Sequence, residues 1–350
     1  MISPIKENDR TKNLLVSVVC PFYNEESIIG DSIVETIKHL ENQFADTAEL
    51  ILVDDGSTDT SLDCARKAIR ASKKLRVQIL HYPLNQGRGR ALKTGINAAE
   101  GEIVVTTESD GSWGFNIVSE IVDKLQNSND LDFVIASPHR SGGGFVNVDK
   151  KRVWLSRYGN LLIRLFFESK VTMNTGMTRG YRRRVIQPLD TQENGKEFHL
   201  EVLLKLMAIG FKFDEVPATL EWPQHRVTRK TPKKRKSSTK LIRTIFTHLK
   251  FVLIAHPVKY FGIISLCFFS LGCLFFALAL QSIFAQGNND VQALLLAVNL
   301  MVVGLVLGGV AVIMHLLRDL LRYTWRNYYD QSVEPTAFKV AKKITSKTKR

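Results

Sequence analysis

The chain has no acidic residue between Trp222 and Asn289, although it contains 34 aspartates and glutamates in all. Its formal net charge of +14 is therefore unevenly distributed. Basic residues gather in "HRVTRKTPKKRKSSTKLIRTIFTHLK" and in the closing "KVAKKITSKTKR". The part before Trp222 is fairly balanced, which argues against a basic groove across the whole fold and against nucleic acid as a partner.

Cysteine is also scarce. The four cysteines, Cys20, Cys64, Cys267 and Cys273, include no CxxC pair and have no metal-ligand spacing. We expect them to be free thiols in a reducing compartment. The opening "MISPIKENDRTKN" lacks an apolar run, so no cleavable signal peptide is expected.

Two long stretches contain no Asp, Glu, Lys or Arg at all: Tyr260 to Phe284 and Val291 to Leu317. Each exceeds the roughly 20 residues that cross a bilayer core. Neither has a polar face, which favours membrane spans over buried core helices. Only "AQGNND" joins them, so they predict a hairpin, and the basic flanks place both of its ends in the cytosol.

These features predict four regions. We expect a cytosolic domain over residues 1–225, a basic, amphipathic juxtamembrane segment over 226–258, two transmembrane helices within 259–318 and a basic cytosolic tail over 319–350. Because the second region adjoins the spans, leaflet binding is favoured over a nuclear-localisation signal at KKRK. The prediction is an integral membrane protein with two spans and both termini cytosolic, in a bacterial or archaeal plasma membrane or the endoplasmic reticulum.

Strand-like and helix-like segments alternate before the basic region. Apolar strands are predicted at 14–24, 48–57, 77–83, 102–110 and 131–137, with helical periodicity between them. Repeated strand–helix units predict an α/β fold with a mostly parallel, doubly wound sheet. No GxGxxG turn follows the first strand, which disfavours a nicotinamide-dependent dehydrogenase.

Polar clusters follow each of the first four strands: Pro21–Glu26, Asp54–Asp59, Asn85–Gly89 and Glu108–Asp110. Taken singly, such turns are more often helix caps or solvated loops. Because the carboxyl ends of parallel strands meet at one edge of a sheet, the four clusters together predict a single crevice.

This set of residues suits a nucleotide-diphosphate sugar. Carboxylates and backbone groups can hold the base and ribose, and a divalent cation held by carboxylates can compensate the diphosphate. The same cation and a basic side chain can stabilise the leaving diphosphate. Glu108 and Asp110 are predicted to share one Mg²⁺ or Mn²⁺ ion, and Arg88, in a glycine-flanked turn, to contact phosphate.

The order PFYNEE, VDDGSTD, NQGRGRALKTG and ESDGS resembles family 2 glycosyltransferases of the GT-A fold. The hairpin and three later segments resemble the polyprenyl-phosphate branch, which includes dolichyl-phosphate mannosyl- and glucosyltransferases: SRYGNLLIRLFF, NTGMTRGYRRRVI and EFHLEVLLKLMAIGFKFDEVPATL. The resemblance covers residues 14 to 225. The early motifs are shared by the superfamily, and the later ones point to the lipid-linked branch.

The resemblance implies a role for each matching residue. Those around the nucleotide would be Pro21, Tyr23, Glu25, Asp54 and Asp55, with one of the two aspartates pairing with the base. The metal ligands would be Glu108 and Asp110. The residues lining the path of lipid phosphate and sugar diphosphate would be Arg140, Arg157 and Arg179. For Arg157 and Arg179, a surface salt bridge is an equal alternative.

Three positions depart from the family pattern. Glu108 stands in place of the first metal aspartate, Ser112 where the mannosyl branch often has glutamine, and Met173 where an aspartate usually precedes the "TG" motif. The longer Glu108 side chain can change the ion or its position. The missing carboxylate at 173 matters little for a polyprenyl phosphate, which is ionised at neutral pH before it attacks.

The predicted activity is transfer of a sugar from a UDP- or GDP-sugar to a polyprenyl phosphate at the cytosolic leaflet, with the inversion that the family resemblance implies. Two alternatives stay open. One is another membrane acceptor, such as a glycerolipid or a polysaccharide, and the other is a catalytically weak GT-A domain that serves as a membrane scaffold.

Overall fold

The computed structural model describes residues 14–150, 153–154, 156–157, 160, 171–174, 176–222, 257–286 and 291–347. The chain divides into two compact units. The first comprises residues 1–162, 170–234 and 328–350, and the second comprises 163–169 and 235–327. Nearly all of the predicted juxtamembrane segment lies outside the described residues.

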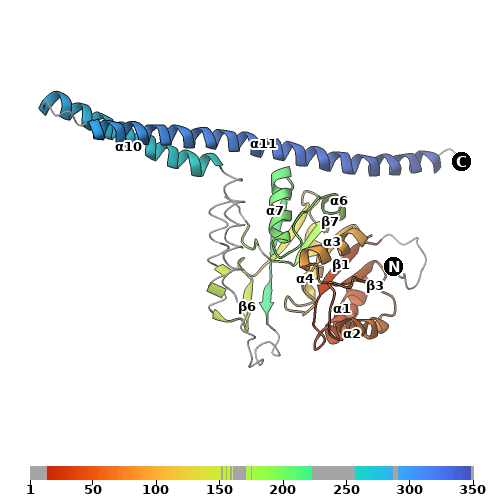
Figure 1. Ribbon diagram of the computed structural model, residues 1–350. Helices are drawn as coiled ribbons and strands as arrows, with labels where there is room; N and C mark the ends of the chain where they lie inside the picture. Colours follow the sequence, from red (N-terminus) through yellow and green to blue (C-terminus); the bar gives the residue numbers. More distant parts are fainter. Residues whose placement is uncertain are drawn as a thin grey trace. The chain divides into compact units, whose positions relative to one another are not determined.

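The first unit is built on a seven-stranded sheet in the order β3-β2-β1-β4-β7-β5-β8. Its strands are β1 (Val16–Phe22), β2 (Ala48–Asp54), β3 (Arg76–His81), β4 (Ile103–Thr106), β5 (Phe133–Ser137), β7 (Arg179–Arg182) and β8 (Phe213–Pro217). Neighbours run parallel except at β7, which lies antiparallel between β4 and β5. Figure 1 labels β1, β3 and β7 of this sheet. The predicted α/β class with a mostly parallel sheet is confirmed.

The central strands follow from their composition. Every residue of β1 and β2 is buried, and both read as nearly continuous apolar runs, as parallel strands covered on two faces do. Their parallel register pairs Val16 with Ala48 and Phe22 with Asp54, which brings the polar residues that follow each strand to the same edge.

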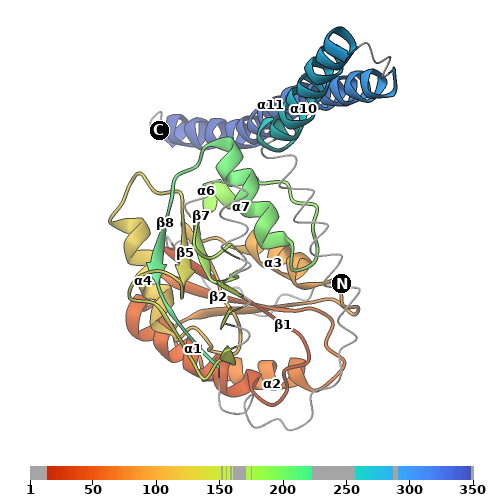
Figure 2. The same ribbon diagram turned by 90° about the vertical axis from the view of Figure 1, so that its left-hand side faces the viewer.

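Helices cover both faces of this sheet (Figure 2). They are α1 (Ile29–Phe44), α2 (Ser61–Ala68), the 3₁₀ turn η1 (Ile69–Ala71), α3 (Arg88–Ala98), α4 (Asn116–Gln126), α6 (Arg183–Ile186) and α7 (Phe198–Ile209). Figure 2 shows α1 and α2 on one side and α3 and α7 on the other. Gly95 lets α3 lie close to the sheet, because a Cβ there would be 3.1 Å from Val53 Cγ2 and would collide with Val19.

A second, two-stranded parallel sheet pairs β6 (Gly144–Val146) with β9 (Thr219–Glu221). It joins the glycine-rich segment after β5 to the segment after β8. Strands β6 to β9 and helices α6 and α7 lie beyond the last strand that the apolar pattern predicts.

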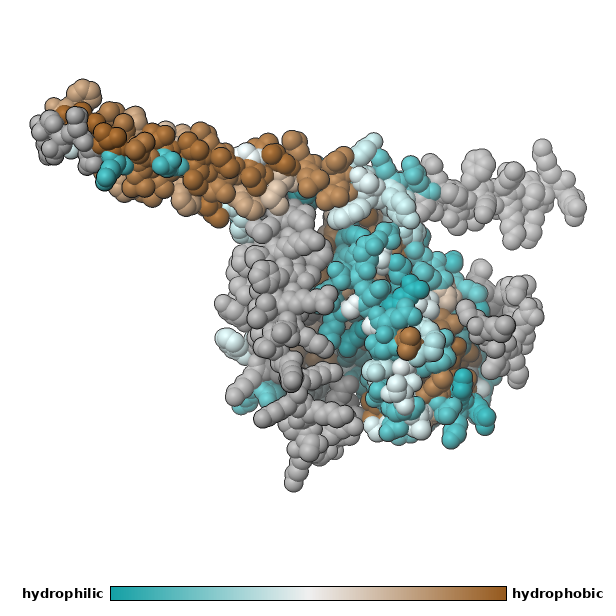
Figure 3. Space-filling view, in the orientation of Figure 1, coloured by the Kyte–Doolittle hydropathy of each residue, from teal (hydrophilic) through white to brown (hydrophobic). Residues whose placement is uncertain are grey.

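The second unit is formed by α10 (Pro257–Gln286) and the first part of α11 (Val291–Lys347). Val258–Phe284 and Val291–Gln331 each contain an 18-residue window with a mean hydropathy of 2.5, and both helices are long and apolar enough to cross a membrane. Only 11% and 17% of these windows is buried, so the two helices are not core helices of the described structure. Figure 3 shows their surface covered with apolar side chains.

Small residues bring α10 and α11 into close contact. Ser265 Oγ donates a hydrogen bond of 2.7 Å to the Gly304 carbonyl oxygen. A Cβ on Gly272 would be 2.8 Å from Met301 N, and one on Gly304 would be 2.8 Å from Phe269 N. This is the packing expected of helices in lipid, where close backbone approach replaces the hydrophobic effect. Helix α11 also continues past Leu317, where the second span was predicted to end, as far as Lys347.

Candidate functional site

The loops after β1 and β2 are joined by hydrogen bonds at the carboxyl edge of the sheet. Asn24 N donates to Ser57 Oγ at 3.0 Å, and Thr58 N donates to Asn24 Oδ1 at 2.8 Å. Glu25 N donates to Ser61 Oγ at 2.7 Å. The structure therefore holds the first two predicted clusters together as one surface.

Asp55 ties the end of β2 to the loop after β3. Its carboxylate accepts hydrogen bonds from Tyr82 Oη at 2.7 Å, Asn85 Nδ2 at 2.9 Å, Gln86 N at 3.0 Å and Gly87 N at 3.1 Å. The side chain is buried. Base pairing by Asp55, as the resemblance implies, would have to replace one of these bonds.

Asp54 is fully buried, and its carboxylate also binds neighbouring residues through hydrogen bonds. It accepts a bond from Ser57 N at 3.0 Å, and its other oxygen lies 2.8 Å from His81 Nδ1. Pro21 is equally buried, as a residue of β1 in register with Val53. Of the predicted nucleotide residues, Tyr23 is the most exposed, at 42%.

The loop after β3 is fixed by its backbone geometry and by contact with residues 192–194, here called the covering segment. Gly87 has φ of +101°, and a Cβ there would collide with the Asn194 carbonyl oxygen. That oxygen accepts hydrogen bonds from Gly89 N at 2.8 Å and Arg90 N at 3.3 Å. Glu201 in turn accepts bonds from the backbone of the covering segment, including Glu193 N at 2.8 Å. Arg88 therefore projects from a rigid turn at the start of α3.

Ser112 positions both predicted metal ligands. Its Oγ donates to Glu108 Oε2 at 2.9 Å, and its backbone N donates to Asp110 Oδ1 at 3.0 Å. Arg88 Nη1 lies 3.8 Å from Glu108 Oε1. Ser109 Oγ donates to Glu25 Oε2 at 2.5 Å. The fourth cluster is thus linked to the first through Ser109 and to the third through Arg88.

A divalent cation fits the chemistry of this edge. Burial, and then the charges of Asp110 and Glu25, raise the pKa of Cys20 to about 12, which marks a negative potential at this point. Within the residues that the structure describes, no group of three or more His, Cys, Asp or Glu is arranged to enclose a metal. Two carboxylate oxygen donors without an enclosing cage match Mg²⁺, which keeps waters and takes further oxygens from substrate phosphates.

Arg179 corrects a prediction. It was expected to line a phosphate path, but its side chain is 0% exposed. Its guanidinium donates to three backbone carbonyls: Nε to Gly176 at 2.8 Å, Nη1 to His199 at 2.8 Å and Nη2 to Asn174 at 2.6 Å. Arg179 therefore fastens the segment after Met173 to α7. The alternative of a surface salt bridge is equally wrong, because the side chain is buried.

Arg140 and Arg157 lie on the surface. Arg140 Nη1 is 2.9 Å from Asp214 Oδ1, and Lys124 Nζ is 2.8 Å from the other oxygen of the same carboxylate. Arg157 is exposed. Burial, and then the charge of Arg157, lower the pKa of His139, whose Nε2 is 3.2 Å from Ser156 Oγ. Neither arginine is tied to the four joined loops by a contact that the structure shows.

A buried carboxylate lies beside Met173 after all, contributed by β8. Glu215 Oε1 accepts hydrogen bonds from Thr172 N at 2.8 Å and Met173 N at 3.1 Å, and Oε2 accepts one from Thr172 Oγ1 at 2.7 Å. It holds the backbone at the position where the family pattern has an aspartate. Sequence reasoning missed it, because an acid in the strand-like "FDEVP" carries no motif.

His199 was also missed. It is 2% exposed in the first turn of α7, and its Nε2 has no hydrogen-bond partner. Burial, and then the charges of Arg179 and Arg88, lower its pKa well below the usual value, so the imidazole is neutral. A single histidine in a mostly apolar helix that also carries Glu201 and Lys205 gives no sequence signal of such a position.

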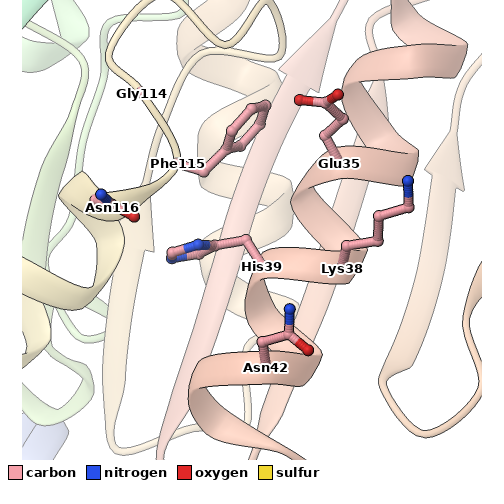
Figure 4. A pocket seen from close by; sticks show the side chains of 7 residues that line it. All are labelled: Glu35, Lys38, His39, Asn42, Gly114, Phe115 and Asn116. Carbon is pink, nitrogen blue, oxygen red and sulfur yellow. The ribbon is translucent and has the colours of Figure 1, made fainter.

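A separate hollow lies away from these residues. It has a volume of about 430 Å³ and is formed by α1 and the turn before α4. Figure 4 shows Phe115 and His39 side by side there, with Glu35, Lys38 and Asn42 along α1. None of the predicted site residues lines it, so we do not place a substrate in it.

Residues 17–189 match the family described as "Glycosyl transferase family 2". This domain belongs to glycosyl transferase family 2. The match covers β1 to β7 and all four joined loops, and the predicted GT-A type of fold is confirmed for this glycosyltransferase domain.

Curated relatives of this family 2 domain include two enzymes whose names specify a polyprenyl phosphate. Dodecaprenyl-phosphate galacturonate synthase of Rhizobium johnstonii is 31% identical over 159 residues, which are 45% of this chain and 46% of that protein. Dolichyl-phosphate beta-glucosyltransferase of Dictyostelium discoideum is 28% identical over 142 residues, 39% of this chain and 43% of that protein. Glycosyltransferase AglD of Haloferax volcanii is 29% identical over 59% of this chain and 33% of its own length. The chain thus spans less than half the length of these relatives.

Solved structures include glucosyl-3-phosphoglycerate synthase from Mycobacterium tuberculosis in complex with uridine diphosphate. That protein is 21% identical to this chain, with a TM-score of 0.49 over 67% of this chain and 80% of the other.

Proposed function

We propose that this protein transfers a sugar from a nucleotide-diphosphate sugar to a polyprenyl phosphate at the cytosolic face of a membrane. The observation that carries the proposal is the joining of four polar loops at one sheet edge, where Ser112 holds Glu108 and Asp110 beside Arg88. Two family 2 relatives whose names specify dodecaprenyl and dolichyl phosphate support the lipid acceptor.

In the proposed site, Glu108 and Asp110 hold Mg²⁺ or Mn²⁺, and Arg88 contacts the donor diphosphate. When bound, the cation compensates the charge that develops on the leaving nucleoside diphosphate. Tyr23 and the loops fastened by Asp54, Asp55 and Glu25 form the walls for the base and ribose of a UDP- or GDP-sugar. Ser112 keeps both carboxylates oriented before the substrate arrives.

The acceptor needs binding more than it needs deprotonation, because a lipid phosphate is ionised at neutral pH. Of the predicted phosphate contacts, Arg157 and Arg140 remain in the proposal and Arg179 does not. A single displacement with inversion is the reaction course that the family resemblance implies. The apolar Met173 is compatible with this chemistry, since no carboxylate base is required there.

The two apolar helices support a membrane location. We propose that α10 and residues 291–317 of α11 form a transmembrane hairpin and that the catalytic domain and both termini are cytosolic. The basic residues that flank the hairpin orient it by the positive-inside rule.

Sugar transfer by isolated membranes tests the proposal. Membranes containing the protein are incubated with radiolabelled UDP- and GDP-sugars, with or without polyprenyl phosphate, Mg²⁺, Mn²⁺ and EDTA. We expect label in the organic phase that requires polyprenyl phosphate and is abolished by EDTA. Asp110→Ala should reduce the transfer activity at least a hundredfold. The control Asp63→Ala changes an exposed carboxylate on α2 and should retain wild-type activity.

Three results would contradict the proposal. Absence of lipid-linked label with every donor would refute the transferase, and label that appears only with a glycerolipid would replace the acceptor. Activity that persists in EDTA and in Asp110→Ala would refute the metal site while leaving the fold intact.

A further inference from the structure

His199 carries a buried polar atom that the protein itself does not satisfy. Three buried side-chain atoms lack a hydrogen-bond partner in the described part of the chain: Glu49 Oε2, Trp113 Nε1 and His199 Nε2. Glu49 Oε2 still faces Arg76 Nε at 3.7 Å. A buried polar group without a partner costs free energy, so such a group calls for a physical reason.

Two chains of contact place His199 beside the joined loops. The first runs through Arg179, whose Nη1 donates to the His199 carbonyl oxygen and whose backbone is in register with Thr106 at the end of β4. The second runs through α3, because a Cβ on Gly89 would be 2.8 Å from Phe198 Cβ. The preceding Arg88 lies 3.8 Å from Glu108.

The charges around His199 favour an anion. The guanidinium of Arg179 is bonded to carbonyl oxygens, which are polar but carry no net charge. The charge of Arg88 also reaches the ring, and both arginines oppose protonation of the imidazole. The positive charges of Arg179 and Arg88 would repel a cation at this position, whereas they would attract a negatively charged phosphate oxygen.

We propose that His199 is a substrate-contacting residue whose Nε2 binds a phosphate oxygen of the donor diphosphate or of the lipid phosphate. The inference rests on the proposed function, since it requires a phosphate-bearing substrate at this sheet edge. It explains the buried, unpartnered nitrogen as a polar atom whose hydrogen bond the ligand supplies. It also gives α7, which the joined loops do not include, a direct part in binding.

Two substitutions separate a binding role from a structural one. In His199→Leu an apolar side chain of similar bulk removes the unsatisfied nitrogen, so the melting temperature of the full chain in detergent should stay constant or rise without ligand. In His199→Gln a side-chain N–H donor remains near the position of Nε2. The matched control is His39→Leu, because His39 Nε2 has a partner in Ser119 Oγ at 3.2 Å and lies outside the proposed site.

Binding is measured by calorimetry in two arms. One arm uses UDP and GDP with Mg²⁺, and the other uses farnesyl phosphate, a short polyprenyl phosphate. We expect His199→Leu to weaken binding at least tenfold in one arm, which then identifies the phosphate that is contacted. His199→Gln should recover affinity to within threefold of the wild type, and His39→Leu should match the wild type in both arms.

The outcomes distinguish this inference from the function on which it rests. If the wild type binds in either arm and His199→Leu binds equally well in both, the inference is refuted and the proposed function stands. A lower melting temperature of ligand-free His199→Leu with unchanged affinities would show a purely structural histidine. If the wild type binds neither kind of ligand, the proposed function fails and the inference fails with it.

Discussion

Charged residues at the carboxyl edge of this sheet divide into those that hold loops and those that face the proposed substrate. Asp55 and Arg179 belong to the first kind, because both side chains are buried and their hydrogen bonds hold neighbouring segments in place. Arg88 belongs to the second, since it lies at the surface beside Glu108. The motif alone does not separate the two kinds, because it records residue types and not the direction of each side chain.

Arg179→Lys should destabilise the catalytic domain. One ammonium cannot reach three divergent carbonyls, so at least one buried acceptor loses its donor, at a cost of about 1–3 kcal/mol. The melting temperature should fall by roughly 3–10 °C for a domain of this size. The control is Arg140→Lys, which preserves the charge of an exposed ion pair and should change stability by less than about 0.5 kcal/mol. Equal melting temperatures for the two variants would contradict the role assigned to Arg179.

His199 should make stability depend on pH. Burial and the nearby arginines lower its folded-state pKa, so below about pH 6.5 the unfolded chain binds a proton that the folded protein does not. Stability is therefore complete above that pH and is lost as the pH falls, by at most about 1.4 kcal/mol per pH unit. Melting curves between pH 5 and pH 7.5 should be flatter for His199→Leu than for the wild type. His39 and His139, whose pKa values are also lowered, are present in both proteins and cancel. Parallel curves would show that His199 titrates normally.

At the scale of elements, the contact between α10 and α11 depends on particular glycines. Gly304→Leu should separate the helices, because its side chain would begin 2.8 Å from Phe269 N. Gly309→Leu is the matched control on the same helix, since nothing lies within 4 Å of a Cβ there. We expect crosslinking between introduced cysteines on the two helices to fall severalfold in the first variant and to persist in the second. The same loss in both would mean that helix composition, and not this contact, holds the hairpin together.

The elements that could be predicted are those whose buried residues form a local apolar pattern in the sequence. Strands β1, β2 and β4 are short apolar runs, and α1 repeats apolar residues at helical spacing, so each is visible without tertiary information. Strand β7 is not visible, because "RGYR" has no apolar period and its first arginine is buried through contacts with both the preceding residues and α7. The same limit applies to the site. Convergence of the four loops follows from topology. The buried positions of Arg179 and His199 depend on how residues 171–201 fold back, and that of Asp55 depends on the loop after β3.

At the scale of the whole molecule, orientation in the membrane can be tested directly. Two apolar helices with basic flanks predict that a reporter fused after Arg350 is cytosolic and that a tag between Gln286 and Val291 is external. Protease protection of each tag in sealed vesicles measures this. A protected C-terminal reporter in inside-out vesicles would reverse the proposed orientation and place the catalytic domain opposite the predicted pool of nucleotide sugar.

The antiparallel position of β7 has a consequence for how the chain is made. Strand β5 leaves the ribosome before either of its neighbours, β7 and β8, exists, so the sheet edge at β4 stays open until residue 182 has emerged. A nascent chain that stops before that point has all four site loops but lacks β7, α7 and β8. We therefore expect cotranslational folding to occur late and in one step, with chaperones protecting an exposed β4 edge. A fragment that ends at residue 150 should remain aggregation-prone even though it contains every motif of the donor site.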